Sequence, residues 1–310
     1  MASAKLFFTS ILVLCACKSV AYAQDDELET VEVSVPFIPL PNDSLQLSGD
    51  LQPLPRWYDF AGNLPRNIGS FAVLSVDTKT LPMIVGLSAV TLGLVASDHA
   101  TYTFTSGYYE RSKTVASVSD VFVSLGDGKM PLILAGVFGV YGFAASDHRA
   151  LRTASQTLEA LLATGLVVQT LKHLTGRESP SEATSESGTW RPFPSFKAYG
   201  HHQSKYHAFP SGHIATTMAT VTVLAENYPE QGWLKPVGYS VVGLVGISLV
   251  NNGWHWYSDL PLGIALGYVF GRIVAHADDG TDALHQDEVK LSFAPVINEY
   301  GNGVHLCFQF

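Results

Sequence analysis

The sequence contains only three cysteines, and two of them, Cys15 and Cys17, lie in the first 23 residues. Removal of that segment would leave Cys307 alone, which excludes an intramolecular disulfide in the processed chain. Charged residues are also scarce, at 15% of the chain, and they sum to a formal net charge of −9. Because nucleic-acid-binding surfaces are basic, this balance argues against a nucleic acid as a partner.

Unambiguous membrane spans are missing as well. Apolar, helix-like segments occur after residue 71, at 81–96, 131–145, 158–171, 214–224, 237–250 and 260–275. Each is about 11 to 17 residues long, whereas a full span needs about 20. Hydrophobic residues nevertheless make up 47% of the chain. We therefore expect an all-α bundle of about six helices, associated with a membrane, in which glycines such as Gly263 and Gly267 allow close helix packing.

The N-terminus is typical of a secretory signal peptide over residues 1–23. Lys5 precedes a short apolar stretch, and the small residues Ala21 and Ala23 mark a cleavage site before Gln24. An uncleaved anchor helix is the alternative. A cleaved signal places the mature protein across the inner membrane, so we predict a cell-envelope protein, either periplasmic or membrane-associated.

The remaining chain divides into three predicted regions. Residues 24–70, with several prolines, are expected to form an extended N-terminal segment or linker. Residues 71–280 form the helical domain. Residues 281–310 alternate between apolar and polar positions around a turn-rich centre, which predicts a small C-terminal β-hairpin.

Three polar stretches, at 172–180, 210–213 and 255–259, interrupt the apolar helices. In the second, Ser211 can cap the N–H groups that begin a helix. Gly212 lets the backbone approach a bound group. His213 lies where the helix dipole favours an anion. If consecutive helices run antiparallel, all three stretches lie at the same end of the bundle.

Together these stretches supply a lysine, an arginine, backbone N–H donors and two histidines. This set suits a phosphoryl group, whose oxygens need cations and donors while one histidine attacks and another donates a proton. His255 and Asp259 are four residues apart and would share a helix face. The carboxylate could then hold one ring nitrogen and leave the other free.

The stretches resemble the motifs of the type 2 phosphatidic acid phosphatase (PAP2) and vanadium haloperoxidase superfamily, over roughly residues 80–276. Those motifs are Lys-x6-Arg-Pro, Pro-Ser-Gly-His and Ser-Arg-x5-His-x3-Asp, and here they occupy 172–180, 210–213 and 248–259. The resemblance implies that His255 is a nucleophile that becomes a phosphohistidine, oriented by Asp259. It also implies that His213 is the general acid. Lys172, Ser211 and the N–H of Gly212 would hold phosphate oxygens.

Two positions depart from the family pattern. Ser179 stands where the first motif has arginine, and Leu249 stands where the third has arginine. A guanidinium binds phosphate with two parallel hydrogen bonds, which serine or leucine cannot replace. Arg177, in the same loop as Ser179, and Arg191 are the expected replacements in the phosphate site.

The resemblance predicts a phosphatase that needs neither cofactor nor metal. Its substrate would be a lipid phosphate or diphosphate, or a small-molecule phosphate. His201, His202 and His207 lie together in a polar loop, but no carboxylate or cysteine accompanies them, so we expect no metal site there.

Two other functions remain open. A catalytically weakened phosphate- or lipid-binding or scaffold protein would explain the loss of two arginines. Vanadate-dependent halide oxidation is disfavoured, since a vanadate site needs the same arginines.

Overall fold

The computed structural model describes residues 55–56, 58–277, 290–298 and 301–309. Two compact units make up the chain: Pro41–Leu284 is one, and Met1–Leu40 together with His285–Phe310 is the other. The predicted signal peptide lies outside the described residues.

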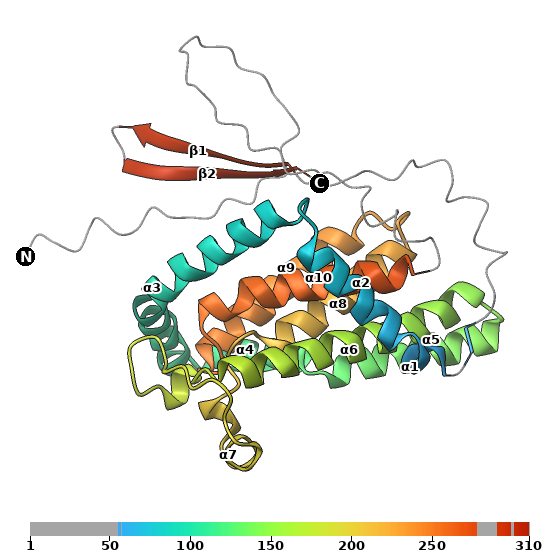
Figure 1. The fold of residues 1–310 in the computed structure, drawn as a ribbon, viewed down its shortest axis with the longest axis horizontal. Helices are drawn as coiled ribbons and strands as arrows, with labels where there is room; N and C mark the ends of the chain where they lie inside the picture. Colours follow the sequence, from blue (N-terminus) through green and yellow to red (C-terminus); the bar gives the residue numbers. More distant parts are fainter. Residues whose placement is uncertain (1–54, 57, 278–289, 299–300, 310) are drawn as a thin grey trace, which may run out of the picture. The chain divides into compact units, whose positions relative to one another are not determined.

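Four helices build the core of the larger unit: α6 (His148–Thr175), α8 (Gly212–Asn227), α9 (Leu234–Asn251) and α10 (Leu260–Ala275). Helices α6, α8 and α10 lie side by side (Figure 1) and share one buried apolar cluster that includes Val168 and Phe270. A second cluster joins α8 to α9 through Ile214 and Leu249. Burial of these faces is the main source of the domain's stability.

Helix α10 packs closely against α8 at a glycine. A Cβ on Gly267 would lie 2.2 Å from the carbonyl oxygen of Ala215 and 2.7 Å from Cβ of Met218. Any side chain at this position would force the two helices apart. The predicted close packing at Gly267 is confirmed.

The N-terminal helices differ from the expected pattern. Helices α1 (Asp59–Gly62) and α2 (Leu64–Val76) replace part of the predicted extended segment, so helical structure begins before residue 71. Pro65 occupies the first turn of α2, where its missing N–H costs nothing. Phe71 stacks on Phe270 with ring centroids 4.8 Å apart. This contact joins residues far apart in the chain, so it depends on the tertiary fold.

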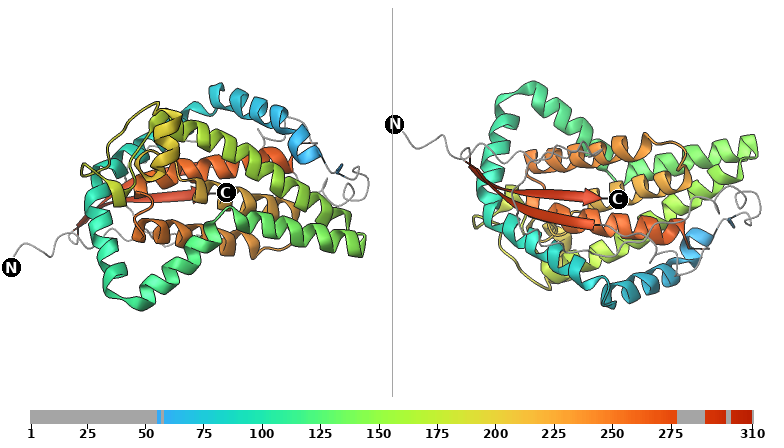
Figure 2. Two further views of the ribbon diagram at one scale, coloured as in Figure 1. Left: turned by 90° about the horizontal axis from the view of Figure 1, so that it is seen from below. Right: turned by 90° about the horizontal axis from the view of Figure 1, so that it is seen from above.

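Helices α3 (Leu81–Arg111), α4 (Lys113–Gly126) and α5 (Lys129–Ala145) follow. Helix α3 is longer than the predicted segment 81–96, because the hydroxyls of Thr101, Thr103 and Thr105 donate to carbonyls four residues earlier and keep polar groups satisfied inside the helix. Helix α4 was not predicted, and the side chain of Ser112 caps it. Figure 2 shows α3 and α4 meeting in a V beside the core helices.

Three helical stretches among the described residues are long and apolar enough to cross a membrane: Leu81–Arg111, Leu234–Asn251 and Tyr257–Ala275. Helices α4 and α5, bent by 58°, would add a fourth if they formed one span. Large apolar side chains on α3 and α5 face outward, among them Leu92, 69% exposed, and Phe143, 84% exposed.

Short helical turns lie in the connections: η1 (Pro180–Glu182), α7 (Phe196–His201), η2 (Gln203–Lys205) and η3 (Tyr257–Asp259). The smaller unit contains strands β1 (Lys290–Asn298) and β2 (Gly301–Gln309). They pair antiparallel, with Lys290 opposite Gln309 and Asn298 opposite Gly301.

Candidate active site

The three polar stretches meet at one end of the core helices. The backbone N–H of Ser211 donates to the carbonyl oxygen of Asp259 at 3.0 Å, which ties the second stretch to the third. The ring centroids of His213 and His255 are 6.0 Å apart. Lys172, in the last turn of α6, lies beside the start of α8. The spatial convergence expected from the sequence is present.

The start of helix α8 is arranged as its local sequence predicts. Ser211 is the N-cap, and its Oγ accepts from the N–H of Ile214. Gly212 is the first helical residue. The first N–H groups of a helix have no intrahelical acceptor, so this end is suited to bind an anion.

His255 is held with a defined tautomer. Its ring is almost fully buried, and Nδ1 lies 2.7 Å from the carbonyl oxygen of Ala208 and 3.5 Å from Oδ2 of Asp259. A carbonyl oxygen only accepts, so Nδ1 carries the proton and Nε2 carries the lone pair. Burial lowers the pKa of His255, while Asp259 acts in the opposite direction. The ring is thus neutral at neutral pH, with the lone pair of Nε2 available.

The sequence suggested that His255 and Asp259 share one face of an α-helix. In the structure they do not lie on an α-helix. His255 precedes the short turn η3, and Asp259 ends it. The backbone N–H of Trp256 donates to Oδ2 of Asp259 at 2.7 Å and holds the carboxylate in place. The flanking aromatic residues diverge: Trp256 is buried, whereas Trp254 is 45% exposed and meets the ring of His213 edge-on.

Lys172 and His213 have strongly perturbed acidities. Burial lowers the pKa of Lys172 to about 8, against the opposing effect of Asp259. Burial, together with repulsion from His255 and Lys172 in their protonated forms, lowers the pKa of His213 to about 3. Among the described residues, the ammonium of Lys172 has no hydrogen-bond or ion-pair partner. An entering anion would be the missing partner for both groups.

His207 is a site residue that the sequence reasoning missed. Its ring centroid lies 6.5 Å from that of His255, and its buried Nδ1 has no hydrogen-bond partner. Burial and the charge of Lys172 lower its pKa to about 3. The sequence grouped it with His201 and His202 in a polar loop. Only a bridge that pairs His207 with Arg177 brings it to the site.

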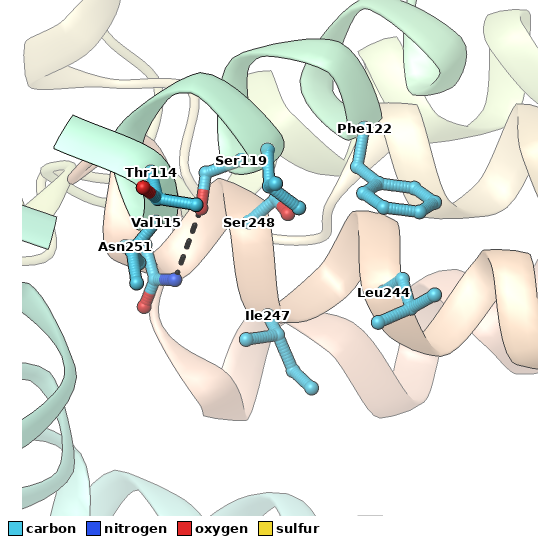
Figure 3. Close-up of a pocket in the computed structure, with 9 residues that line it drawn as sticks. Thr114, Val115, Ser119, Phe122, Leu244, Ile247, Ser248 and Asn251 are labelled. Carbon is cyan, nitrogen blue, oxygen red and sulfur yellow. Dashed lines mark hydrogen bonds between the residues drawn. The ribbon is translucent and has the colours of Figure 1, made fainter. Parts of the chain in front are cut away.

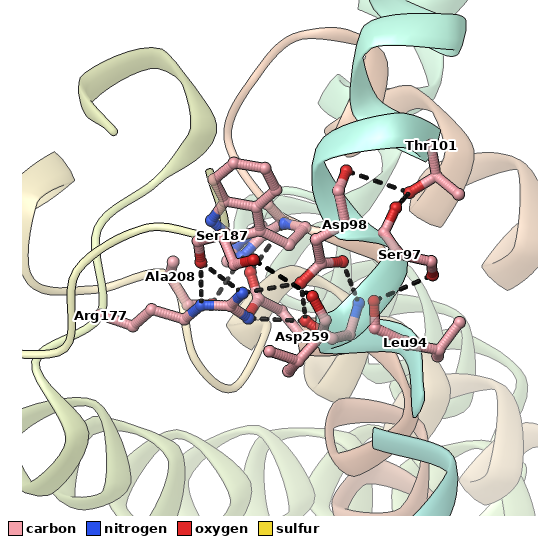
Figure 4. Close-up of polar contacts among 12 residues, drawn as sticks. Leu94, Ser97, Asp98, Thr101, Arg177, Ser187, Ala208 and Asp259 are labelled. Atoms are coloured by element: carbon pink, nitrogen blue, oxygen red, sulfur yellow. Dashed lines mark hydrogen bonds and ion pairs between the residues drawn. The ribbon is translucent and has the colours of Figure 1, made fainter. Parts of the chain in front are cut away.

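Arg177 does not offer a donor to phosphate (Figure 4). Its fully buried guanidinium donates to Asp98, Asp259, Ser258 and, twice, the carbonyl oxygen of Ser187. These five hydrogen bonds use all five of its N–H groups. The phosphate-binding role expected for Arg177 has no support in these contacts.

Arg191 is engaged within its own loop. Its guanidinium donates to the carboxylate of Glu178 and, at 3.3 Å, to the hydroxyl of Thr184. Glu178 is fully buried and also accepts from the backbone N–H groups of Thr184 and Thr189. Neither predicted replacement arginine therefore has its guanidinium free at the histidine pair.

The two positions without arginine are both buried. Leu249 is fully buried in the apolar cluster with Ile214 and Val245, so the third-motif arginine position has become part of the core. Its carbonyl oxygen accepts from the N–H of Trp254 at 3.0 Å and so supports the loop that carries His255. Ser179 is 1% exposed, and its Oγ has no hydrogen-bond partner.

A pocket of about 230 Å³ lies between α4 and α9 (Figure 3). Its lining is mostly apolar and includes Val118, Phe122, Leu244 and Ile247. Ser248, the residue before Leu249, also lines it. No histidine is among the described residues that line this pocket. Helix α9, which forms one of its walls, leads directly into the loop that carries His255.

Comparison with known proteins agrees with this arrangement. Residues 154–280 match the model of the PAP2 superfamily. The match contains Lys172, Ser211, His213, His255 and Asp259, so the resemblance predicted from the three motifs is confirmed.

One curated protein and two solved structures are also similar to parts of this chain. Lipid A 1-phosphatase of Porphyromonas gingivalis is 37% identical over 67 residues, which are 21% of this chain and 15% of that protein. A transmembrane PAP2-type phosphatidylglycerolphosphate phosphatase from Bacillus subtilis is 22% identical, with a TM-score of 0.44 over 63% of this chain and 95% of that one. LpxE of Aquifex aeolicus is 18% identical, with a TM-score of 0.43 over 57% and 93%.

Proposed function

We propose that this protein is a cell-envelope phosphatase that removes phosphate from a lipid phosphate or diphosphate through a phosphohistidine at His255. The observation that carries the proposal is the state of His255: Nδ1–H is held by Ala208 and faces Asp259, which leaves the lone pair of Nε2 unshared beside His213. The match of residues 154–280 to the model of the PAP2 superfamily supports it.

In the first step, the Nε2 lone pair of His255 attacks phosphorus, and the bond from phosphorus to the leaving oxygen breaks. Protonated His213 gives its proton to that oxygen. Burial holds the pKa of His213 at about 3. A bound phosphate dianion would raise this pKa, since an adjacent negative charge favours the protonated ring.

In the second step, water attacks the phosphohistidine. Neutral His213 takes a proton from the water, the bond between phosphorus and nitrogen breaks, and phosphate leaves with the original state of His255 restored. Lys172 and the N–H groups at the start of α8 would hold the phosphate oxygens in both steps. The unpartnered His207 and Ser179 are candidates for the contacts that two arginines make in the family.

A lipid substrate is supported by the surface and by one relative. Outward-facing apolar side chains on α3 and α5 suit a membrane, and the similar protein of P. gingivalis is a lipid A 1-phosphatase. The apolar pocket beside Ile247 suits an acyl chain. Ile247→Trp should then reduce release from lipid phosphates while leaving release from an aryl phosphate unchanged.

The deciding experiment measures phosphate release by the purified full chain from lipid and aryl phosphates. We expect His255→Ala to abolish release, and His213→Ala to reduce it by about 100-fold, the usual contribution of a general acid. His202→Ala changes an exposed histidine of the neighbouring loop and serves as the control. Radiolabelled substrate should leave an alkali-stable, acid-labile label on wild type and none on His255→Ala. Wild-type activity in His255→Ala would refute the proposal.

A second candidate is a PAP2-like protein that binds phosphate without turnover. It is favoured by one observation: Ser179 and Leu249 replace both family arginines, while Arg177 and Arg191 are engaged elsewhere. Binding of inorganic phosphate that depends on Lys172, with no release from any substrate, would establish this function instead.

A further inference from the structure

Asp98 reaches the site from outside the three motifs. Within α3, all of which the structure describes, it is the one buried residue, and its side chain is completely buried. Its carboxylate accepts from the backbone N–H of Ser258 at 3.2 Å, from the Ser258 hydroxyl, and from Nη2 of Arg177 at 2.7 Å. A helix whose other residues are exposed or half-buried thus places one charged group against the loop that carries His255.

Arg177 connects this carboxylate to the site. Its Nη1 pairs with Oδ1 of Asp259 at 2.5 Å, and all three charged side chains are 0% exposed. The other oxygen of Asp259 faces Nδ1 of His255. Figure 4 shows the contacts that run from Asp98 through Arg177 to Asp259. The contact of Asp259 with His255 continues them to the candidate nucleophile.

The charges in this cluster depend on one another. Arg177 lies between two carboxylates, so its removal would leave two buried like charges close together. Removal of Asp98 would leave the guanidinium paired with Asp259 alone. Well-packed apolar residues often stabilise a core as much as buried ion pairs do, so stability alone gives little reason for such a cluster. Its contact with Asp259 supplies a functional reason.

We propose that Asp98 and Arg177 are positioning residues for the nucleophile. Arg177 holds the Asp259 carboxylate in the orientation that faces His255, and Asp98 holds the guanidinium so that it cannot turn away from Asp259. Their effect on turnover rests on the phosphatase function proposed above. Their effect on the titration of the His255 ring is independent of that function.

Several charged or titratable groups face His255: Lys172 from α6, His207 from the loop before α8, His213 from α8 and Asp259 from η3. Asp98 and Arg177 act on it through Asp259. Neutralising Asp98 removes a negative charge and disfavours the protonated ring, so the titration midpoint of His255 should fall. Neutralising Arg177 removes a positive charge, so the midpoint should rise.

Shifts of the His255 titration midpoint in opposite directions would distinguish a specific effect of Asp98 and Arg177 from a general destabilisation of the fold. The experiment follows the ring nitrogens of His255 by NMR in the full chain in detergent micelles, with the signal assigned by its loss in His255→Asn. We expect the midpoint to move down in Asp98→Asn and up in Arg177→Gln, each by roughly half a pH unit or more. The double variant should lie between them.

A matched control is Glu159→Gln. Glu159 is another buried carboxylate of the same unit, and it accepts hydrogen bonds from Asn63 and Asn67. The Glu159→Gln variant should leave the titration midpoint of His255 unchanged. Shifts of the same sign in both site variants, or no shift in either, would overturn the proposal.

Turnover provides the second readout. We expect kcat for phosphate release to fall about tenfold or more in both site variants, with KM within about twofold, because neither residue contacts substrate. An unchanged kcat in an active enzyme would also overturn the proposal. If wild type hydrolyses nothing, the phosphatase function fails, while the NMR midpoints still decide the positioning role.

Discussion

The ammonium group of Lys172 lies beside the first residue of helix α8, so that a Cβ placed on Gly212 would be 3.6 Å from Nζ. A buried cation therefore lies at the N-terminus of α8, beside the N–H groups that have no intrahelical acceptor. Both attract an anion, and the lysine has no other partner among the described residues. This relationship makes the binding of an oxyanion the first property to measure.

Anion affinity should fall as the pH rises through about 8, the pKa to which burial lowers Lys172. Above this pH the folded protein loses the charge, whereas the unfolded chain keeps it until about 10.5. Stability should consequently rise between these values, because the unfolded state binds the extra proton. Calorimetric titration with sulfate, whose own charge is constant over this range, measures the affinity.

The variants of Lys172 give the controls for this prediction. Lys172→Met should bind sulfate weakly at every pH, and Lys172→Arg should keep its affinity above pH 8, since a guanidinium stays charged. Constant wild-type affinity up to pH 10 would show that another group supplies the charge.

Acid should destabilise the protein through His207 and His213. Both have a folded pKa of about 3, well below the usual 6.5. Between these values the unfolded chain binds more protons, so stability should be fully present above 6.5 and decline as the pH falls towards 3. Each histidine contributes a slope of up to about 1.4 kcal/mol per pH unit. Urea unfolding at several pH values should show shallower slopes in His207→Gln and His213→Gln, and identical slopes would contradict the assignment.

Gly176→Ala should be strongly destabilising. Gly176 ends α6 with a φ of +56°, and a Cβ would lie 1.8 Å from the carbonyl oxygen of Arg191. Backbone strain and this clash should together cost more than about 2 kcal/mol. Gly165→Ala is the control on the same helix, because a Cβ there meets nothing within 4 Å. Gly165→Ala should raise the free energy of unfolding by about 0.5 to 1 kcal/mol. Thermal unfolding of both variants tests this difference.

The two family arginine positions should respond differently to substitution. Ser179→Ala removes a buried hydroxyl that has no partner, so stability should be unchanged or higher by up to about 1 kcal/mol. Leu249→Arg puts a charge into an apolar cluster and should cost more than about 3 kcal/mol. Unfolding and phosphate-release measurements test both. A stable Leu249→Arg variant with faster release would show that the guanidinium reaches the phosphate site.

Much of the candidate site was predictable because its parts are local. The cap at Ser211, the glycine after it and the histidine in the first turn of α8 depend on neighbours in the chain. The order and spacing of the motifs then placed Lys172, His255 and Asp259 at the same end of the helices. Apolar periodicity likewise marked the core helices α8, α9 and α10.

The role of Arg177 was not predictable from its position. Its closeness to Ser179 in sequence suggested a replacement phosphate ligand. The backbone bridges that pair Arg177 with Trp190 and His207 turn its side chain into the interior instead. There the guanidinium lies over the ring of Trp190 at 4.7 Å and donates to two carboxylates.

The sequence by itself determined the three motifs, the helix start that suits an anion, and the PAP2 resemblance, since each rests on residue type and short spacing. Tertiary structure alone decided that Asp98 pairs with Arg177, which is 79 residues away in the chain, and that His207 lies near His255. The physical reason is that a buried charged or polar group is costly without a partner, and the tertiary fold determines which partners are near it. Those partners here come from helices and loops that are distant in the chain.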